Sequence, residues 1–410
     1  MIRFLTAGES HGISLSVIIE GFPSNVEIPS DYLNHHLARR QMGYGRGFRM
    51  KIEKDRAEII SGVRNNRTLG SPISILVKNK DWEHWKDVMS VDSFNPESDS
   101  KRVTIPRPGH ADLNGVIKYN FDDIRNSIER SSARETAMRV AAGSFCRLLL
   151  EILGIKIGSY VENIGPSHSA SDEKTDPFTL KLLKNKTGSN FDASVIGKRG
   201  DRSPVRLLNK KREAEIIVSI TKAMEAGDTL GGTFVVVVSG LPAGFGSYMS
   251  WDRKLDAKLA EAVMSINAVK GVEIGGGFFL SGKPGSEVMD EIIVKGDCFM
   301  RKTNYAGGIE GGISNGMPVI IRASMKPVPT LMKPLKSVDL TDMKQVKAFR
   351  ERSDYSAVPA CSVIAESMAA FVIANAVLEK TGGDSIEEVI TNFHSYKNNI
   401  FNRISKNFRK

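Results

Sequence analysis

Hydrophobic positions along this chain repeat in two different periods, and each period predicts one kind of element. Runs rich in β-branched residues predict strands at 15–20, 73–77, 233–239 and 319–322. Apolar residues three and four positions apart predict helices at 31–41, 129–153, 212–226, 253–266 and 361–380. Strands and helices do not alternate in single steps, so the pattern predicts an α+β fold with antiparallel sheets rather than a doubly wound parallel fold.

The clearest helical stripe lies within 129–153. Its apolar positions are Ala133, Ala137, Val140, Ala141, Phe145, Leu148 and Ile152. Gly154 follows as a C-terminal cap. In a continuous helix, Arg130 and Arg134 are four residues apart and share a face.

Two stretches of the chain have the same pattern. Residues 16–23 and 236–242 each give an apolar strand, a Gly-x-Pro turn and then a helix, beginning after Asp31 and Asp252 respectively. Either the chain is an internal duplication, with halves at about 1–200 and 201–400, or it repeats a common strand-turn-helix unit. The polar segments 91–102 and 166–204 do not have the composition of linkers, so we expect one domain over 1–410, with 166–204 as a polar excursion from the core.

Composition narrows the class of protein. The 410 residues are 41% hydrophobic, with no apolar run of about 18 residues, so no transmembrane helix is expected. The N-terminus lacks the apolar core of a signal peptide. Cys146, Cys298 and Cys361 match no metal spacing and no disulfide framework. These features predict a cytoplasmic protein without a structural metal.

The formal net charge of +10 admits three interpretations: a nucleic-acid surface, a site for small polyanions, or charge for solubility. Position favours the second, because the arginines gather with glycines between residues 39 and 139. Aromatic residues are only 7% of the chain and do not interleave with these arginines, as base stacking would require. We therefore expect no nucleic-acid partner.

Two motifs near the N-terminus have the residue types of an anion site. Residues 8–12 read GESHG, which places His11 in a glycine-bearing loop. Such a histidine suits proton transfer near neutral pH, and equally suits a hydrogen-bonded turn. Residues 39–49 read RRQMGYGRGFR, four arginines with three glycines. Guanidinium forks and free backbone N–H groups bind phosphate and carboxylate oxygens, so this segment predicts an anion site.

Further candidate chemistry lies in the middle and the last quarter of the chain. Residues 107–112 read RPGHAD, with His110 after a rigid Pro-Gly corner, and 130–134 read RSSAR. Residues 326–330 read KPVPT, a stiff extended segment suited to lie along a flat ring. Asp354 is either a paired surface carboxylate or a base. His35 and His36 lack partners at metal-ligand spacing.

Taken together, these segments resemble the chorismate synthase family. The ordered match runs along nearly the whole chain and also includes 227–232 (GDTLGG), 264–273 (MSINAVKGVE), 306–312 (AGGIEGG) and 352–359 (RSDYSAVP). The resemblance implies a lyase that converts 5-enolpyruvylshikimate 3-phosphate to chorismate and phosphate by 1,4-elimination. This step is the last common one of aromatic amino-acid biosynthesis (the shikimate pathway), and it needs reduced FMN without net redox change. The resemblance also implies a β-α-β-α sandwich of two mainly antiparallel sheets with an internal pseudo-repeat, assembled as a homotetramer.

Roles are implied for residues that match the family's motifs. His11 resembles the histidine near the leaving phosphate, His110 the one near the flavin ring, and Asp354 the carboxylate that works with flavin N5 in removing the ring proton. The residues implied to bind substrate are Ser10, Arg49, Arg107 and Arg134. The residues implied to contact FMN are Arg130, Ser131, Ser132, Asn267, Ala268, Gly311, Lys326, Pro327, Val328, Pro329, Thr330 and Arg352. Arg40 and Arg46 align with positions assigned to NADPH, and they equally suit the substrate.

The chain departs from the family pattern at Leu207-Leu208, where Cys-Pro is common, and at Tyr305, where Asn is common. Two alternatives stay open from the sequence: an added NADPH:FMN reductase activity, and a basic nucleic-acid-binding protein. No dinucleotide fingerprint is present to support the first.

Overall fold

The computed structural model describes residues 1–47, 54–92, 101–166, 176–186, 191–296, 298–351 and 353–408. A first antiparallel sheet has the order β1-β2-β6-β3. Its strands are β1 (Arg3–Ala7), β2 (Ser14–Glu20), β6 (Ile73–Lys78) and β3 (Glu58–Ser61). Alternate side chains of β2 and β6 are buried on one face, as expected for a sheet that packs on one side only.

A second antiparallel sheet has the order β7-β8-β14-β9. Its strands are β7 (Lys156–Ile164), β8 (Gly232–Ser239), β14 (Val319–Met325) and β9 (Val269–Ile274). In β8 all residues from Phe234 to Ser239 are buried, because both faces of this sheet are covered. All four strands predicted from β-branched runs are confirmed.

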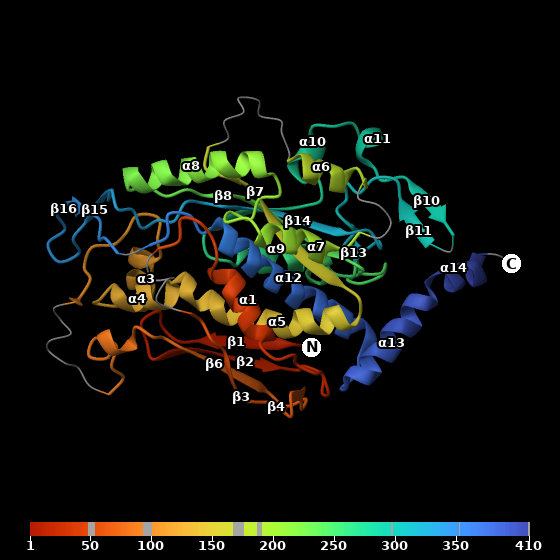
Figure 1. Cartoon of the computed structure of the whole chain (residues 1–410), viewed down its shortest axis with the longest axis horizontal. Helices are drawn as coiled ribbons and strands as arrows, with labels where there is room; N and C mark the ends of the chain where they lie inside the picture. The colour runs from red at the N-terminus through yellow and green to blue at the C-terminus, as the bar shows by residue number, and fades with distance from the viewer. Residues whose placement is uncertain are drawn as a thin grey trace.

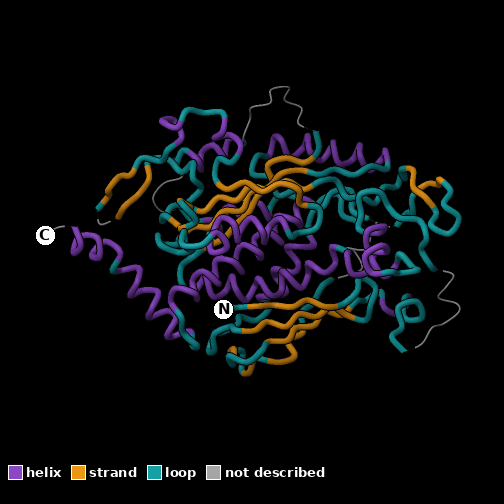
Figure 2. Tube along the Cα trace, turned by 180° about the vertical axis from the view of Figure 1, so that it is seen from behind, coloured by secondary structure: helices purple, strands orange, loops and turns teal. Residues whose placement is uncertain are grey.

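Helices fill the space between the two sheets (Figures 1 and 2). They are α1 (Tyr32–Gln41), α5 (Thr136–Ile152), α9 (Leu255–Met264) and α12 (Val358–Thr381). Together with the inner faces of the sheets they form one continuous apolar core. α12 is long and apolar enough to span a membrane, but 89% of its most apolar stretch is buried in the protein, which is typical of a core helix.

The described parts of 166–204 do not form the polar excursion expected from the sequence. They contain α6 (Pro177–Leu183) and α7 (Ala193–Asp201), which cover the outer face of the second sheet. Leu182, Leu183 and Ile196 are buried there against β7 and β8. A few well-spaced apolar residues are enough to cover this face of the sheet. The two helices were not predicted because most residues between these apolar positions are polar. α8 (Lys210–Ala226) lies beside β7.

The single helix predicted over 129–153 is wrong, because the chain breaks at Ser132. α4 (Arg125–Ser131) ends there, Ser132 is extended with φ −62° and ψ 139°, and a 3-10 turn (Ala133–Glu135) precedes α5. The Ser132 hydroxyl accepts a hydrogen bond from the Arg134 N–H at 3.3 Å, a local bond that competes with helix. Arg130 and Arg134 therefore do not share a helix face. Gly154 does follow α5 in the left-handed conformation, with φ +81°.

The remaining elements lie around the frame formed by the two four-stranded sheets and the helices between them. The helices are α3 (Asp112–Tyr119), α10 (Phe278–Ser281), α11 (Gly285–Val288), α13 (Ile386–Asn398) and α14 (Ile400–Phe408), with short 3-10 turns at Trp82–His84 and Trp251–Arg253. The two-stranded ribbons are β4–β5 (Val63–Arg64, Arg67–Thr68), β10–β11 (Ile292–Lys295, Cys298–Arg301), β12–β13 (Ile309–Glu310, Ile313–Ser314) and β15–β16 (Lys336–Val338, Gln345–Lys347). α13 packs Val389 and Phe393 into the main core, and α14 follows it and extends away from the body of the molecule (Figure 1).

The two halves of the frame follow the same order. The first runs β1, β2, α1, β3, β6 and α5, and the second runs β7, β8, α9, β9, β14 and α12. In each sheet the four strands lie in the spatial order first, second, fourth, third.

Candidate active site

His11 lies on the turn between β1 and β2 and is 8% exposed. Gly8 begins this turn with φ +106°, and a Cβ there would lie 2.4 Å from the Ser14 carbonyl, so the tight turn requires glycine. Both carboxylate oxygens of Glu129 lie 3.0 Å from His11 Nδ1. The His11 ring stacks on Trp85 with centroids 4.1 Å apart. Ser10 lies next to it and bonds the Ser132 hydroxyl at 3.2 Å.

Two of the predicted anion-binding arginines are paired through one carboxylate beside this turn. Arg40 and Arg134 both donate to Asp55, whose side chain is fully buried. Arg134 also donates to Asn79 Oδ1, and Asn79 in turn donates to the backbone carbonyl of Gly12. Burial, and then the neighbouring charges of Arg134 and Arg46, lower the pKa of Arg40 to about 10 against the opposing effect of Asp55. Guanidinium donors thus gather beside the His11 turn, which suits the binding of an anionic ligand.

A second histidine-carboxylate pair is formed within the RPGHAD motif. His110 Nδ1 lies 2.6 Å from Asp112 Oδ1, and Asp112 also accepts hydrogen bonds from the Arg107 backbone and guanidinium. Burial by itself raises the pKa of Asp112, but hydrogen bonds from His110 and Arg107 hold it well below its usual range. Arg107 further donates to Thr330 and Glu351. The guanidinium of Arg107 thus fixes the surroundings of His110.

Helix packing and a chain of contacts bring the two histidine pairs together. α3, which begins at Asp112, packs against α4, where a Cβ on Gly115 would lie 2.0 Å from the Ser127 hydroxyl. Lys326 Nζ donates to the Gly109 carbonyl at 2.7 Å, and the Lys326 N–H donates to the Ala268 carbonyl at 2.9 Å.

The Pro-rich segment and the residues after α9 are held beside α4. Pro329 faces Gly109, and the Thr229 hydroxyl donates to the Val328 carbonyl. Pro327, which precedes Val328 in the chain, is exposed. Asn267 Nδ2 donates to the Ser131 carbonyl at 3.0 Å.

A pocket of about 390 Å³ opens next to these residues. It is lined by Phe4, Leu5, Thr6, Arg130, Ser132, Glu135, Arg139, Ser265, Asn267 and Met368. Asn267 Oδ1 is buried there and accepts no hydrogen bond from the described residues. Arg130 is exposed and supplies a cation. An acceptor without a donor, a cation and a cavity of this size fit a phosphorylated ring ligand such as FMN.

Asp354, the candidate carboxylate in the last quarter of the chain, is paired with an arginine. It forms an ion pair with Arg46 at 3.0 Å and accepts a hydrogen bond from the Gly47 N–H at 2.7 Å. The Asp354 charge also acts on Arg40, so this pair lies beside the Arg40–Asp55–Arg134 group. The structure therefore brings the two ends of the chain to one site. Arg49 and Arg352, the remaining predicted residues of these segments, lie outside the described residues.

Gly311, one of the residues expected to contact FMN, lies away from the other residues of this site. Gly311 lies in the turn of the β12–β13 ribbon, and the adjacent Gly312 carbonyl accepts from the Leu255 N–H at the start of α9. Asn267 lies beyond the other end of that helix. Ten helical residues span about 15 Å, so Gly311 and Asn267 lie well apart.

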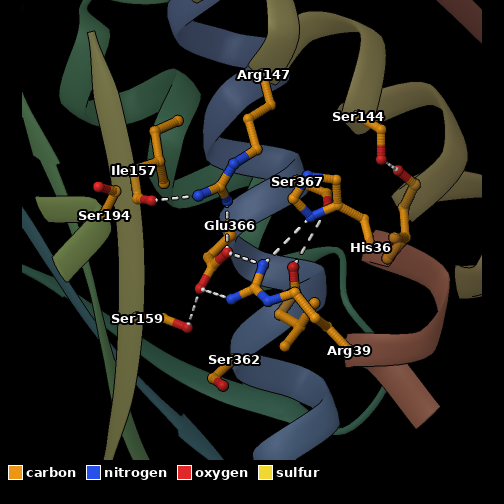
Figure 3. Close-up of polar contacts among 12 residues, drawn as sticks. His36, Arg39, Ser144, Arg147, Ile157, Ser159, Ser194, Ser362, Glu366 and Ser367 are labelled. Carbon is orange, nitrogen blue, oxygen red and sulfur yellow. Dashed lines mark hydrogen bonds and ion pairs between the residues drawn. The ribbon is translucent and has the colours of Figure 1, made fainter. Parts of the chain in front are cut away.

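Arg39 does not belong to the anion site, although it stands in the arginine cluster of the sequence. It is 4% exposed and reaches into the core between α1, α5, α12 and β7, where it donates to Glu366 at 2.7 and 2.9 Å (Figure 3). Arg147, Arg206 and the Ser159 hydroxyl bind the same carboxylate. His36 lies beside Arg39, and burial followed by the charges of Arg147 and Arg39 lowers its pKa to about 2. A neutral His36 and an ionised Glu366 thus belong to a structural network.

Several residues of the site were not predicted. Glu129 was included only as the start of a helix, and Asp112 only as the end of a motif. Asp55, Asn79 and Trp85 carry no local signal, because their partners are far away in sequence. The departures from the family pattern lie outside the contacts described above: Leu207 is in the main core, and Leu208 and Tyr305 pack on the outer face of the second sheet.

Comparison with known proteins identifies the family. The family model for chorismate synthase matches residues 2–378. The chain belongs to the chorismate synthase family. It is 51% identical to chorismate synthase from Prosthecochloris aestuarii, with 98% of both chains covered, and 50% identical to that from Sulfurihydrogenibium sp., with 98% of this chain and 100% of the relative covered. A solved structure titled "Crystal Structure of Chorismate Synthase" aligns with a TM-score of 0.77 at 39% identity over 98% of each chain.

Proposed function

We propose that the chain catalyses the last step of the shikimate pathway, the conversion of 5-enolpyruvylshikimate 3-phosphate to chorismate and phosphate. It is a carbon-oxygen lyase of the chorismate synthase family. The observation that carries the assignment of roles is the pairing of each predicted histidine with a buried carboxylate, beside a group of guanidinium donors. Such a site binds a substrate with a phosphate and two carboxylates and controls protons next to it.

The substrate would be held by cations of the first third of the chain. We assign this role to Ser10, Arg107 and Arg134, with Arg49 by motif alone. Since Arg134 is fixed by Asp55 and Asn79, its charge is held in place before substrate binds. Prepositioned positive charge stabilises the phosphate as its negative charge develops. His11, next to Ser10, is then placed to protonate the departing phosphate.

The cofactor would lie in the pocket near Arg130, Ser132 and Asn267. When bound, reduced FMN supplies an electron-rich ring that allows the elimination without net redox change. The other residues assigned to its binding are Ser131, Ala268, Lys326, Pro327, Val328, Pro329 and Thr330. His110 would lie beside the ring, and Asp354 would receive the proton removed from the substrate. By motif, Arg40 and Arg46 are assigned to NADPH as reductant and equally to the substrate, and the chain has no dinucleotide fingerprint that favours the first role.

The proposed domain organisation is one domain built from an internal repeat. It is supported by the identical order of elements in the two halves and by the identical strand order in the two sheets. A continuous core across both halves supports their folding as one unit. A cytoplasmic location is in keeping with this fold.

We also propose assembly as a homotetramer, with the outer face of the first sheet as one of its interfaces. Leu5 and Ile18 are cross-strand partners there and are 73% and 48% exposed. The ion pairs Arg3–Glu20 and Lys78–Glu58 flank them. An apolar centre with a charged rim is typical of an interface between subunits.

The experiment is an anaerobic assay of the purified protein with reduced FMN and 5-enolpyruvylshikimate 3-phosphate. Phosphate release is expected, together with a tighter affinity for FMN when substrate is present. No phosphate release from a folded, FMN-binding protein would contradict the proposal. An NADPH oxidation assay without added reductase tests the reductase activity separately. Light scattering on the protein and on Ile18→Lys tests the assembly, which the lysine is expected to weaken.

A further inference from the structure

His11 Nδ1 has its proton fixed by a carboxylate. Glu129, at the end of α4, is 1% exposed, and both its oxygens lie 3.0 Å from Nδ1. An ionised carboxylate only accepts hydrogen bonds, so Nδ1 must be the donor in the neutral as well as the charged ring. The nitrogen that gains and loses a proton is therefore Nε2.

Glu129 is held ionised by its own surroundings. Burial by itself raises the pKa of Glu129, but hydrogen bonds from the His11 ring and backbone and the charge of Arg125 hold it below its usual value. The His11 N–H donates to Glu129 Oε2 at 2.8 Å, and Arg125 donates to Oε1 at 3.2 Å. One carboxylate thus fixes both the turn and the ring.

The ring face of His11 is also in a defined environment. Trp85 stacks on it with an interplanar angle of 29°. Arg125 and Lys101 each lie 4.9 Å from the centroid of the Trp85 ring. Among the described residues, the charged groups around His11 are Glu129 and Arg125 on α4, Lys101 before it, Asp81 bonded to the Trp85 N–H, and Glu9 on the same turn. Of these, Glu129 has its carboxylate in direct contact with the imidazole.

From this geometry we propose that Glu129 is a positioning residue that holds the His11 ring in one tautomer and directs Nε2 towards the leaving phosphate. This inference rests on the proposed function, in which His11 is the general acid. An opposite charge at hydrogen-bond distance favours the charged ring. The carboxylate stays ionised and returns the ring to the same tautomer after each proton transfer.

The test uses Glu129→Gln, which keeps the shape of the side chain and removes its charge. Without the charge, the His11 ring loses the carboxylate that favours its charged form. The alkaline limb of the pH profile of phosphate release should therefore move to lower pH, with little change in KM. Glu129→Asp, which restores the charge, should return the limb most of the way to the wild-type position.

The matched control is Glu162→Gln. Glu162 is also a buried carboxylate paired with an arginine, Arg322, but it lies in the second sheet and touches no histidine in the described structure. The Glu162→Gln substitution should leave the pH profile of phosphate release unchanged. A Glu129→Gln profile that falls at all pH values without moving would indicate a merely structural role and overturn the proposal.

An activity-independent readout separates this proposal from the proposed function. The pKa and tautomer of His11 are measured by NMR of ring-labelled histidine, with the signal assigned by loss in His11→Ala. A lowered His11 pKa in Glu129→Gln together with the moved pH profile supports the proposal. An unchanged His11 pKa overturns it even if the enzyme is active. A lowered pKa with an unmoved profile also overturns it, because His11 is then not the acid. If wild-type protein releases no phosphate, the proposed function has failed, and the NMR result still reports on Glu129.

Discussion

Arg39 and Glu366 form a two-pronged ion pair across 327 positions of the sequence, at 2.7 and 2.9 Å, in the centre of the helix layer. The next residue along the chain, Arg40, instead points towards Asp55 and the active site. Helix α1 therefore connects a structural network to the cationic site through two adjacent arginines. Removing the partner of such a buried group leaves charge uncompensated in the core.

Glu366→Gln should strongly destabilise the protein. Three arginines would each lose one of the two carboxylates they pair with, and breaking a buried pair typically costs about 3–5 kcal/mol. The measurement is the midpoint of urea unfolding at fixed protein concentration. The control is Glu27→Gln, whose partner Arg67 is exposed, and its effect should stay within about 1 kcal/mol. Equal midpoints for the two variants would contradict the role given to Glu366.

Stability should fall between pH 7.5 and 5.5, and His36 should account for part of this fall. The pKa of His36 is lowered to about 2 in the folded protein, so below pH 6.5 the unfolded chain takes up a proton that the folded protein does not. For one histidine this favours unfolding by about 1.4 kcal/mol at pH 5.5. His36→Asn should flatten the curve by that amount. The same slope in wild type and variant would show that His36 is protonated when folded.

At still lower pH, protonation of the buried carboxylates Glu366 and Asp112 should reduce the stability of the fold further. The pKa of Glu366 is held well below its usual value by Arg39 and Arg147, despite burial that opposes this, and the pKa of Asp112 is lowered as described above. A lowered carboxylate pKa stabilises the fold above the unfolded value, about 4, and this contribution disappears as pH falls further. Glu366→Gln should thus have a shallower acid unfolding curve than wild type.

His110→Ala should reduce turnover by about 10²–10⁴, the usual contribution of a positioned proton-transfer group. The protein should stay folded, because the His110 ring lies at the edge of the site and Arg107 keeps Asp112 paired. Phosphate release and circular dichroism are the two measurements. His394→Ala, on the surface of α13, is the control and should be fully active. Normal turnover in His110→Ala would reject the role assigned to it.

Gly143→Ala should destabilise the contact between α5 and α12. A Cβ on Gly143 would lie 2.4 Å from the Cβ of Ser367 and 2.7 Å from its backbone, so the helices would have to separate. Overpacking of this kind costs about 1–3 kcal/mol. Gly285→Ala is the matched control, since its Cβ would meet open space. Thermal unfolding of both variants checks the prediction, and a Gly143→Ala protein as stable as the control would refute it.

The sequence by itself predicted four of the eight strands in the two main sheets and most of the helices between them. Periodicity alone was enough for the strands at β2, β6, β8 and β14, because alternation and β-branching are local properties. The motifs of glycine, arginine and histidine led to the family, which the comparisons confirm, and made His11 and His110 the candidate catalytic residues. The break at Ser132 was missed because a side-chain bond to the backbone overrode an apolar stripe that continues through it.

Only the tertiary structure decided which groups meet. Arg39 and Arg40 look alike in sequence, and the burial of one face of α1 against α12 sends the first to the core and the second to the site. Glu129 and Asp55 acquire their roles from partners 118 and 79 positions away. Such pairings depend on how the sheets and helices pack. Packing brings together residues that are far apart in sequence, and no periodic pattern in the sequence indicates which of them will meet.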